Sequence, residues 1–305
     1  MDGAIEKYSV NIHGLMKMRV MVTLALYLVL WTPDVVLAST IQTDPQGELA
    51  ITDTLISVGA NRLHFQIIEG GSPAILLEAG GGMDLTGWVN LAPRLARETG
   101  ATIISYSRAG FGKSDLPEIP HDMSVEVGWL WNALEHFGLD TDLILVGHSF
   151  GGWMIRLEAS EHPDAVRGIV FVDPFTVEFV DLLGVEYLDN HPMAGKLPFD
   201  TSDPSKLTVL QRAQMRMVGD GLAPKMEIMR TTRIPEGIPV IMITSGLQWL
   251  PKEEEHRAWQ TAHEQMAASI PGAVLLVAEQ SNHMIPWFQP DIIVESVIRI
   301  IRDKR

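Results

Sequence analysis

The fold of this chain is decided by LILVGHSFGGWMIRLEASEH, residues 143–162. Its first four residues are apolar and predict a short buried strand, and residues 151–162 predict a helix. Between them lies a G-x-S-x-G motif, Gly147-His148-Ser149-Phe150-Gly151. The two glycines allow a crowded strand-to-helix turn, which is expected to hold Ser149 out at the sheet edge as a nucleophile. The alternative is a serine that caps an ordinary helix.

The same alternation of short apolar strands and helices continues on both sides of this motif. Such repeats predict an α/β fold: a mostly parallel eight-stranded sheet with helices on both faces. The first two strands flank a Gly59-Ala60-Asn61 turn and predict an antiparallel hairpin. The expected strands are residues 52–58, 62–69, 74–77, 101–106, 143–146, 168–172, 240–244 and 273–277; the expected helices are 88–99, 125–137, 151–162, 253–269 and 290–301.

The alternation lapses over residues 174–237, which are richer in methionine, proline and aspartate. Helical pieces are expected there at roughly residues 206–218 and 222–230, without strands between them, so this segment is predicted to be a helical lid. It divides the expected α/β core into residues 39–173 and 238–305. The lid methionines, Met215 and Met226 among them, are expected to line an adaptable substrate pocket. Alternatively, they simply pack the lid onto the sheet.

The first 38 residues have the features of a secretory signal peptide. Lys17 and Arg19 precede the apolar run of residues 20–31, and Ala38 ends a stretch suited to cleavage. The run is too short to span a bilayer comfortably. We therefore expect cleavage after Ala38 and a periplasmic or secreted protein without stable membrane association; an uncleaved anchor is the alternative.

Composition excludes several classes of function. The chain has 305 residues, with 23 lysines and arginines against 38 acidic residues, giving a net charge of -15. Such a charge repels phosphate backbones, so a nucleic-acid partner is not expected. The absence of cysteine excludes thiol catalysis, disulfides and cysteine-bound zinc. No histidines cluster closely as metal ligands, and no metal or other cofactor is implied.

A candidate general base follows the last expected strand, in Ser281-Asn282-His283-Met284. Histidine suits this role because it titrates near neutral pH, so it can take a proton from serine and return it to a leaving group. We therefore predict that His283 is the base.

Two carboxylates compete for the role of the acid that orients His283. Asp173 ends the strand 168–172, at the same sheet edge as Ser149. Glu253 follows the strand 240–244 only after a loop without carboxylates, and acidic residues at a helix start commonly complement the helix dipole. We predict Asp173, with Glu253 as the alternative; Asp173 could instead be a structural aspartate beside Pro174.

Taken together, residues 52–302 resemble the α/β-hydrolase superfamily, in which the order is serine, acid, histidine. Leu77-Glu78-Ala79-Gly80-Gly81-Gly82 resembles the glycine loop after the third strand of that family. The resemblance implies an oxyanion hole made by the backbone N–H groups of Gly81 and Phe150. The stretch from Tyr106 to Ser114 resembles the family's next strand-end loop. Most members place the acid after the strand that corresponds to residues 240–244, and a minority place it where Asp173 stands.

The resemblance implies a serine hydrolase that acts through a covalent acyl-enzyme. Carboxylic esters are the first expected substrates, followed by lactones and amides, so the expected partner is a small ester-like molecule. The alternatives are a cofactor-free lyase or perhydrolase, and a small-molecule receptor that keeps the triad but turns over slowly. Ser149 argues against epoxide hydrolases and dehalogenases, which have aspartate at that position. The fold alone does not choose the substrate.

Overall fold

The computed structural model describes residues 40–43, 49–189, 202–219 and 221–303. The predicted signal peptide lies outside these residues. Within them, no helix is both long and apolar enough to cross a lipid bilayer.

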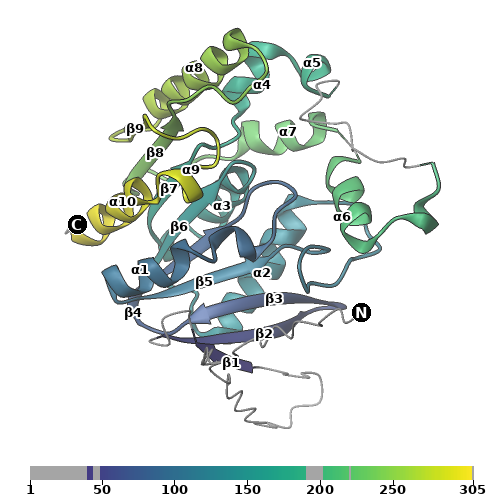
Figure 1. Cartoon of the computed structure of the whole chain (residues 1–305), viewed down its shortest axis with the longest axis vertical. Coiled ribbons are helices and arrows are strands. Elements are labelled where there is room, and N and C mark those ends of the chain that lie inside the picture. The colour runs from purple at the N-terminus through teal and green to yellow at the C-terminus, as the bar shows by residue number, and fades with distance from the viewer. Residues whose placement is uncertain (1–39, 44–48, 190–201, 220, 304–305) are drawn as a thin grey trace, which may run out of the picture.

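The described strands form one sheet of nine, in the order β1-β2-β3-β5-β4-β6-β7-β8-β9 (Figure 1). β1, β2, β3 and β5 pair antiparallel in succession, and every other pairing is parallel. All eight predicted strands are present, and the additional one is β1, a short edge strand in a stretch where no element was predicted. The strands are β1 Thr40–Thr43, β2 Ala50–Val58, β3 Asn61–Ile68, β4 Gly71–Glu78, β5 Ala101–Ser107, β6 Leu143–His148, β7 Val166–Val172, β8 Val240–Ser245 and β9 Val274–Ala278.

The central strands are buried on both faces, because successive side chains point to opposite sides of the sheet. On β6, Leu145 joins one hydrophobic cluster and Ile144 the other. The first cluster is covered by α2 (Met123–Phe137), α3 (Gly151–Glu161) and the end of α8 (Glu253–Ser269). The second is covered by α1 (Leu91–Thr99) and α10 (Pro290–Arg302). The result is the predicted sandwich of helices around a mostly parallel sheet.

The described part of residues 174–237 contains four helices and no strand. They are α4 (Val177–Leu183), α5 (Val185–Asp189), α6 (Val209–Val218) and α7 (Ala223–Thr231). α4 packs against α8, whereas α6 stands apart from the sheet at the right of Figure 1. α6 and α7 match the predicted helical pieces, while α4 and α5 were not predicted.

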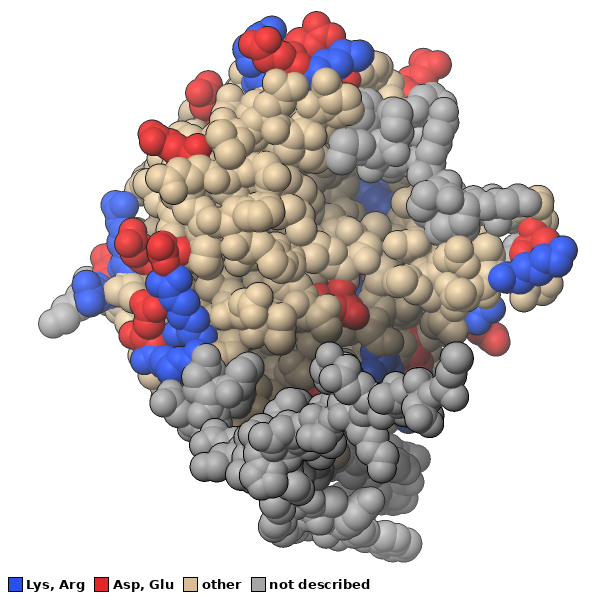
Figure 2. Space-filling view, in the orientation of Figure 1, with Lys and Arg blue, Asp and Glu red and all other residues tan. Residues whose placement is uncertain are grey.

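Charged side chains are unevenly spread over the face shown in Figure 2. They gather over α8 at the top and α10 at the left, and the centre of this face is mostly uncharged. Both of these groups contain positive as well as negative side chains.

Candidate active site

Ser149 occupies a strained turn between β6 and α3. Its backbone has φ of 53°, in the left-handed region that favours glycine, and its N–H donates to the carbonyl oxygen of Val172 at 3.0 Å. A Cβ atom on Gly147 would lie 2.6 Å from the carbonyl oxygen of Gly151, and one on Gly151 would lie 2.5 Å from that of Glu78. Both glycines of the motif are therefore required by close backbone approach, and Ser149 is not the cap of an ordinary helix.

Asp173 directly follows β7 and is completely buried. It too has a left-handed backbone, with φ of 45°. Its Oδ2 lies 2.7 Å from Nδ1 of His283. Its Oδ1 accepts hydrogen bonds from the backbone N–H of Ser245 at 2.7 Å and from Nε1 of Trp259 at 2.9 Å. The structure thus brings Asp173 and His283 together, from segments far apart in the chain.

The hydrogen bonds to Asp173 keep it ionised despite its burial. Burial alone would raise its pKa, but the hydrogen bond and charge of His283, the charge of His263 and the hydrogen bond from Trp259 lower the pKa to about 2. A buried carboxylate that stays charged at neutral pH can accept from Nδ1–H of His283 and fix its tautomer.

Glu253 lies elsewhere, on the surface. Its side chain is 74% exposed and pairs with Arg257 one helical turn along α8. Most members of the superfamily carry the acid after the strand that corresponds to β8. Here the backbone N–H of Ser245, at the end of β8, donates a hydrogen bond to Asp173. The alternative acid therefore has no contact with His283 in this structure.

Aromatic rings surround the imidazole of His283. Trp249 is stacked on it, with centroids 4.1 Å apart and planes 14° apart, and Trp259 meets it edge-on at 5.6 Å. In the turn that carries Ser149, the ring centroid of His148 lies 4.7 Å from that of His283. Nε2 of His148 donates to the backbone oxygen of His283 at 2.8 Å. Burial, followed by the charge of His283, lowers the pKa of His148 to about 3, so His148 is a neutral donor. Sequence reasoning missed all of these neighbours.

In the part of the chain that the structure describes, no hydrogen bond joins Ser149 Oγ to His283 Nε2. Catalytic hydrogen bonds are commonly long before substrate binds and tighten in the complex. The turn that carries Ser149 and the loop that carries His283 are instead joined by the hydrogen bond from His148 to the backbone oxygen of His283.

The predicted oxyanion-hole residues are neighbours. A Cβ atom at Gly81 would lie 3.5 Å from Cβ of Phe150 and 3.3 Å from Cε of Met217 on α6. The loop before Gly81 is held by Arg108, which donates to the carbonyl oxygens of Ala79 at 2.7 Å and Gly80 at 2.5 Å.

Arg108 is itself part of a buried polar network. It forms an ion pair with Glu78, which also accepts from the hydroxyl of Tyr106. Only 2% of the Arg108 side chain and 1% of that of Glu78 are exposed. The sequence signal for this network was a pair of opposite charges at the ends of two apolar strands.

Comparison with known proteins agrees with this arrangement. Residues 73–218 match the family described as alpha/beta hydrolase fold. The solved epoxide hydrolase CorEH superposes with a TM-score of 0.60, covering 84% of this chain and 100% of its own at 18% identity. The 2-hydroxy-6-oxo-6-phenylhexa-2,4-dienoate hydrolase from a Rhodococcus strain superposes with a TM-score of 0.60. The match covers 83% of this chain and 99% of that hydrolase, at 17% identity. This chain has the α/β-hydrolase fold.

Other similar proteins differ in activity and in how far the match extends. An esterase from Thermogutta terrifontis gives a TM-score of 0.54 over 82% of this chain and 98% of its own, at 19% identity. An uncharacterised Bacillus subtilis protein, YqjL, is 23% identical over 75% of this chain and 84% of its own. The match spans only 18% of the probable transporter efuK of Hormonema carpetanum, at 34% identity over 40% of this chain. At these identities the solved structures show the fold of this α/β hydrolase and not its substrate.

The two methionines predicted to bind substrate occupy different surroundings in this α/β hydrolase. Met226 is 2% exposed and packs in the hydrophobic cluster that joins α7, α3 and α8. Met215 is half-buried on α6, while Met217 of the same helix is the methionine that lies against Gly81. The packing alternative therefore fits Met226, and Met217 is the better candidate for contact with substrate.

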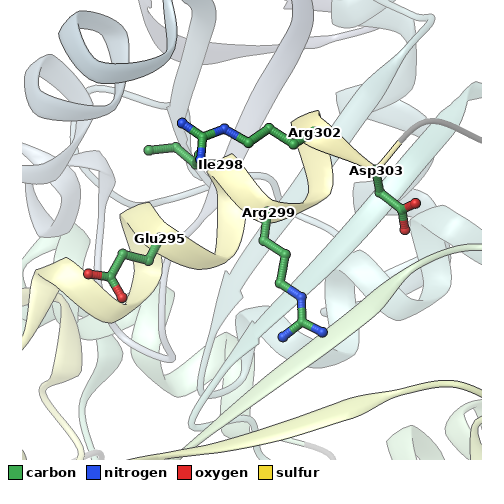
Figure 3. Close-up of a pocket in the computed structure, with 5 residues that line it drawn as sticks. All are labelled: Glu295, Ile298, Arg299, Arg302 and Asp303. Atoms are coloured by element: carbon green, nitrogen blue, oxygen red, sulfur yellow. The ribbon is translucent and has the colours of Figure 1, made fainter.

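Two cavities of this α/β hydrolase lie apart from the predicted triad. An open hollow of about 630 Å³ on the outer side of α10 is lined by Glu295, Ile298, Arg299, Arg302 and Asp303 (Figure 3). A cavity of about 120 Å³ is lined by Arg156, Arg233 and the end of α8. Neither is lined by Ser149, Asp173 or His283. Among the described residues, no group of side chains could hold a metal ion.

Proposed function

We propose that this α/β hydrolase is a serine hydrolase that cleaves carboxylic esters through an acyl-enzyme. The observation that carries the proposal is the 2.7 Å hydrogen bond between the buried carboxylate of Asp173 and Nδ1 of His283. It lies at the sheet edge where the strained turn presents Ser149. A strained nucleophile turn, an imidazole and an ionised buried acid are the parts that acyl transfer requires.

In the proposed first step, Ser149 Oγ attacks the ester carbonyl carbon. Because ionised Asp173 can only accept a hydrogen bond, Nδ1 of His283 carries the proton, and Nε2 is left free to take the proton from Ser149. The tetrahedral intermediate then collapses. The C–O bond to the leaving group breaks, and the imidazolium returns its proton to the departing alcohol.

In the second step, water replaces serine as the nucleophile. His283 takes a proton from water, hydroxide attacks the acyl carbon, and the ester bond to Ser149 breaks as Oγ regains the proton. In both steps the negative oxygen is proposed to accept from the N–H groups of Gly81 and Phe150, which belong to adjacent backbone segments.

Esters are favoured because the proposed machinery needs only a carbonyl and a leaving alcohol. The names of the Thermogutta terrifontis esterase and of a Bacillus subtilis carboxylesterase support this substrate class, whereas the dienoate hydrolases among the similar proteins cleave other substrates. Lactones come next. A cofactor-free lyase or perhydrolase and a slow-turnover receptor remain the alternatives.

The test is turnover and covalent labelling at one serine. The wild type should hydrolyse a panel of 4-nitrophenyl esters, give burst kinetics and take up an organophosphonate at Ser149. Ser149→Ala should lose hydrolysis and labelling while keeping its melting temperature. Binding of esters without sustained turnover would favour the receptor, and labelling at another residue would overturn the proposal.

We also propose that residues 174–237 form a lid and that the chain is exported with cleavage after Ala38. Residues 1–39 lie outside those that the structure describes. Sequencing the amino terminus of exported protein decides this point, because cleavage gives Ser39 as the first residue and an anchor leaves the chain intact.

A further inference from the structure

His121 is a buried polar residue without a partner. It lies two residues before α2, with only 3% of its side chain exposed, and neither of its ring nitrogens has a hydrogen-bond partner among the described residues. The nearest carboxylate oxygen, Oε2 of Glu126, is 3.9 Å from Nε2, too far for a hydrogen bond. Buried polar groups are nearly always paired, so an imidazole with two unpaired nitrogens needs an explanation.

The position of His121 relative to the proposed site suggests one. Its ring centroid is 6.0 Å from that of Phe150, the residue that follows the nucleophile. Phe150 in turn adjoins Gly81. His121 is therefore linked to both proposed oxyanion donors through one side chain, that of Phe150.

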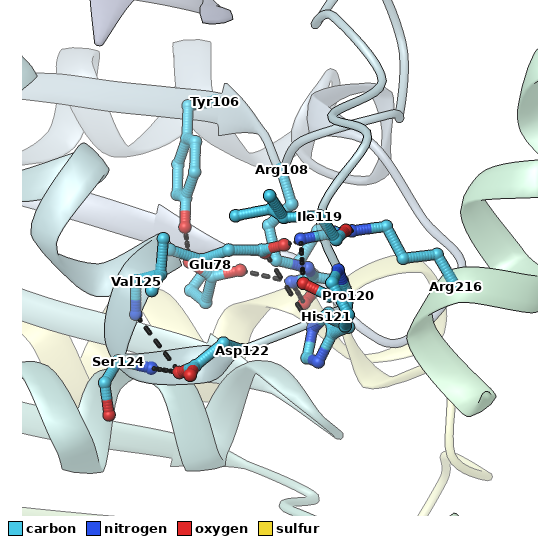
Figure 4. Close-up of polar contacts among 12 residues, drawn as sticks. Glu78, Tyr106, Arg108, Ile119, Pro120, His121, Asp122, Ser124, Val125 and Arg216 are labelled. Atoms are coloured by element: carbon cyan, nitrogen blue, oxygen red, sulfur yellow. Dashed lines mark hydrogen bonds and ion pairs between the residues drawn. The ribbon is translucent and has the colours of Figure 1, made fainter. Parts of the chain in front are cut away.

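The lid helix α6 fixes the segment that carries His121. From α6, Arg216 donates to the carbonyl oxygens of Ile119 at 2.7 Å and Pro120 at 3.1 Å, and to Oε1 of Glu126 at 2.6 Å (Figure 4). The bond to Glu126 engages Oε1 of the carboxylate whose Oε2 is nearest to His121. The bonds from Arg216 also join the loop before α2 to the helix whose Met217 lies against Gly81, so the ring is held beside the proposed site.

Three cationic side chains act on His121, and two of them also pair with carboxylates, Arg216 with Glu126 and Arg108 with Glu78. Burial, followed by the charges of Lys225, Arg216 and Arg108, lowers the pKa of His121 to about 3. The ring is therefore a neutral hydrogen-bond donor near neutral pH, and the nearby cations favour a negatively charged acceptor over a positively charged one.

We propose that His121 binds a carboxylate on the substrate, so that the preferred substrates are esters that carry a second, free carboxylate on the acyl chain. The imidazole N–H donates to a carboxylate oxygen, and the cations near the ring stabilise the charge. This inference rests on the proposed ester hydrolysis and adds the class of acyl group. An uncharged polar group that merely accepts a hydrogen bond is the competing occupant.

The experiment compares two esters of the same shape. One is the mono-4-nitrophenyl ester of glutaric acid, and the other is 4-nitrophenyl 5-oxohexanoate, in which a methyl ketone replaces the carboxylate. We expect the wild type to prefer the glutarate ester in kcat/KM. His121→Phe keeps a ring of similar size but no nitrogen, and should lower kcat/KM for the glutarate ester by about 10- to 100-fold. The ketone ester should change by less than about threefold, because it makes no charge-assisted bond.

Two further variants separate binding from structure. His121→Gln retains an N–H donor and should keep part of the preference for the glutarate ester. His256→Phe removes another buried histidine with two unpaired nitrogens, on α8, and should leave the ratio between the two esters unchanged. Circular dichroism and melting temperatures show whether each variant is folded.

A binding measurement keeps the result independent of turnover. Monomethyl glutarate should bind Ser149→Ala by calorimetry about 10- to 100-fold more tightly than it binds the Ser149→Ala, His121→Phe double variant. If the wild type hydrolyses both esters and His121→Phe lowers both equally, or neither, the inference about His121 is wrong while the proposed hydrolysis stands. Equal preference of the wild type for the ketone ester also overturns the carboxylate assignment. If no ester is hydrolysed but the difference in calorimetry is found, the proposed hydrolysis fails and the carboxylate site remains.

Discussion

Trp249 lies face to face on the imidazole of His283, with ring centroids 4.1 Å apart. It belongs to the loop after β8, the position that holds the acid in most superfamily members. Here the proposed acid is Asp173, and Trp249 places an aromatic face at that position. Such a face attracts a cation, so Trp249 is suited to stabilise the imidazolium that forms when His283 takes the serine proton.

Replacing Trp249 by leucine should therefore disfavour the protonated imidazole. Since a cation over an aromatic ring gains about 0.5–2 kcal/mol, we expect kcat to fall by about 3- to 10-fold with a smaller change in KM, measured by steady-state kinetics. Trp249→Phe keeps an aromatic face and should lie between the wild type and the leucine variant. An unchanged kcat in the leucine variant would show that Trp249 only fills space.

Asp173→Asn should reduce kcat by about 10⁴-fold, because an amide no longer selects the Nδ1–H tautomer of His283. Glu253→Gln should change kcat by less than twofold, since Glu253 is 74% exposed and pairs only with Arg257. Steady-state kinetics on one 4-nitrophenyl ester decide between them. Comparable small losses in both variants would show that neither carboxylate orients the base.

The same Asp173 variant should also differ from wild type in acid stability. The pKa of Asp173 is lowered to about 2 from 3.8, so its ionised form stabilises the fold fully above pH 4, and this contribution is lost as the pH falls toward 2. The contribution is on the order of 2 kcal/mol. The difference in unfolding free energy between wild type and Asp173→Asn, from urea titrations, should shrink over this range. A difference independent of pH would contradict the lowered pKa.

Arg108→Lys should disturb the proposed oxyanion loop more than the overall fold. Lysine keeps the charge beside Glu78 but cannot reproduce the fork that binds the carbonyl oxygens of Ala79 and Gly80. We expect kcat to fall by about 10-fold or more, with a melting temperature lower by several degrees. The control Arg94→Lys alters a surface pair with Glu98 and should leave kcat unchanged. An unchanged kcat in Arg108→Lys would separate this network from catalysis.

Within the lid, Met217→Ala should alter chain-length preference, because Met217 lies against Gly81. Met226→Ala should instead lower the unfolding free energy by about 2–5 kcal/mol, the usual cost of truncating a buried methionine, and affect all esters alike. Met215→Ala serves as a half-buried control from the same helix as Met217. Profiles over acetate to decanoate esters, together with melting temperatures, test the three variants. Equal profiles for all three would argue against a lid that selects acyl chains.

The sequence predicted the parts of this molecule that depend on local pattern. Eight strands, the turn at Ser149 and the position of Asp173 at a strand end follow from short-range periodicity and glycine placement. The pairing of Glu78 with Arg108, 30 residues apart, could not be predicted, because it arises when β4 and β5 become neighbours with Leu77 opposite Ser105. The stacking of Trp249 on His283 likewise depends on how two strand-end loops meet. Helices α4 and α5 were missed because they are short and their stability depends on packing against other elements.

The unit β6–α3–β7 carries Ser149 and is followed directly by Asp173, which lies only 24 positions after Ser149. A ribosome therefore completes the nucleophile and its acid together, well before His283 leaves the exit tunnel. Until then the nascent chain holds a serine that has no base to deprotonate it. If the proposed activity is correct, a hydrolase built in this order cannot attack esters in the compartment of its synthesis until the last strand has been added.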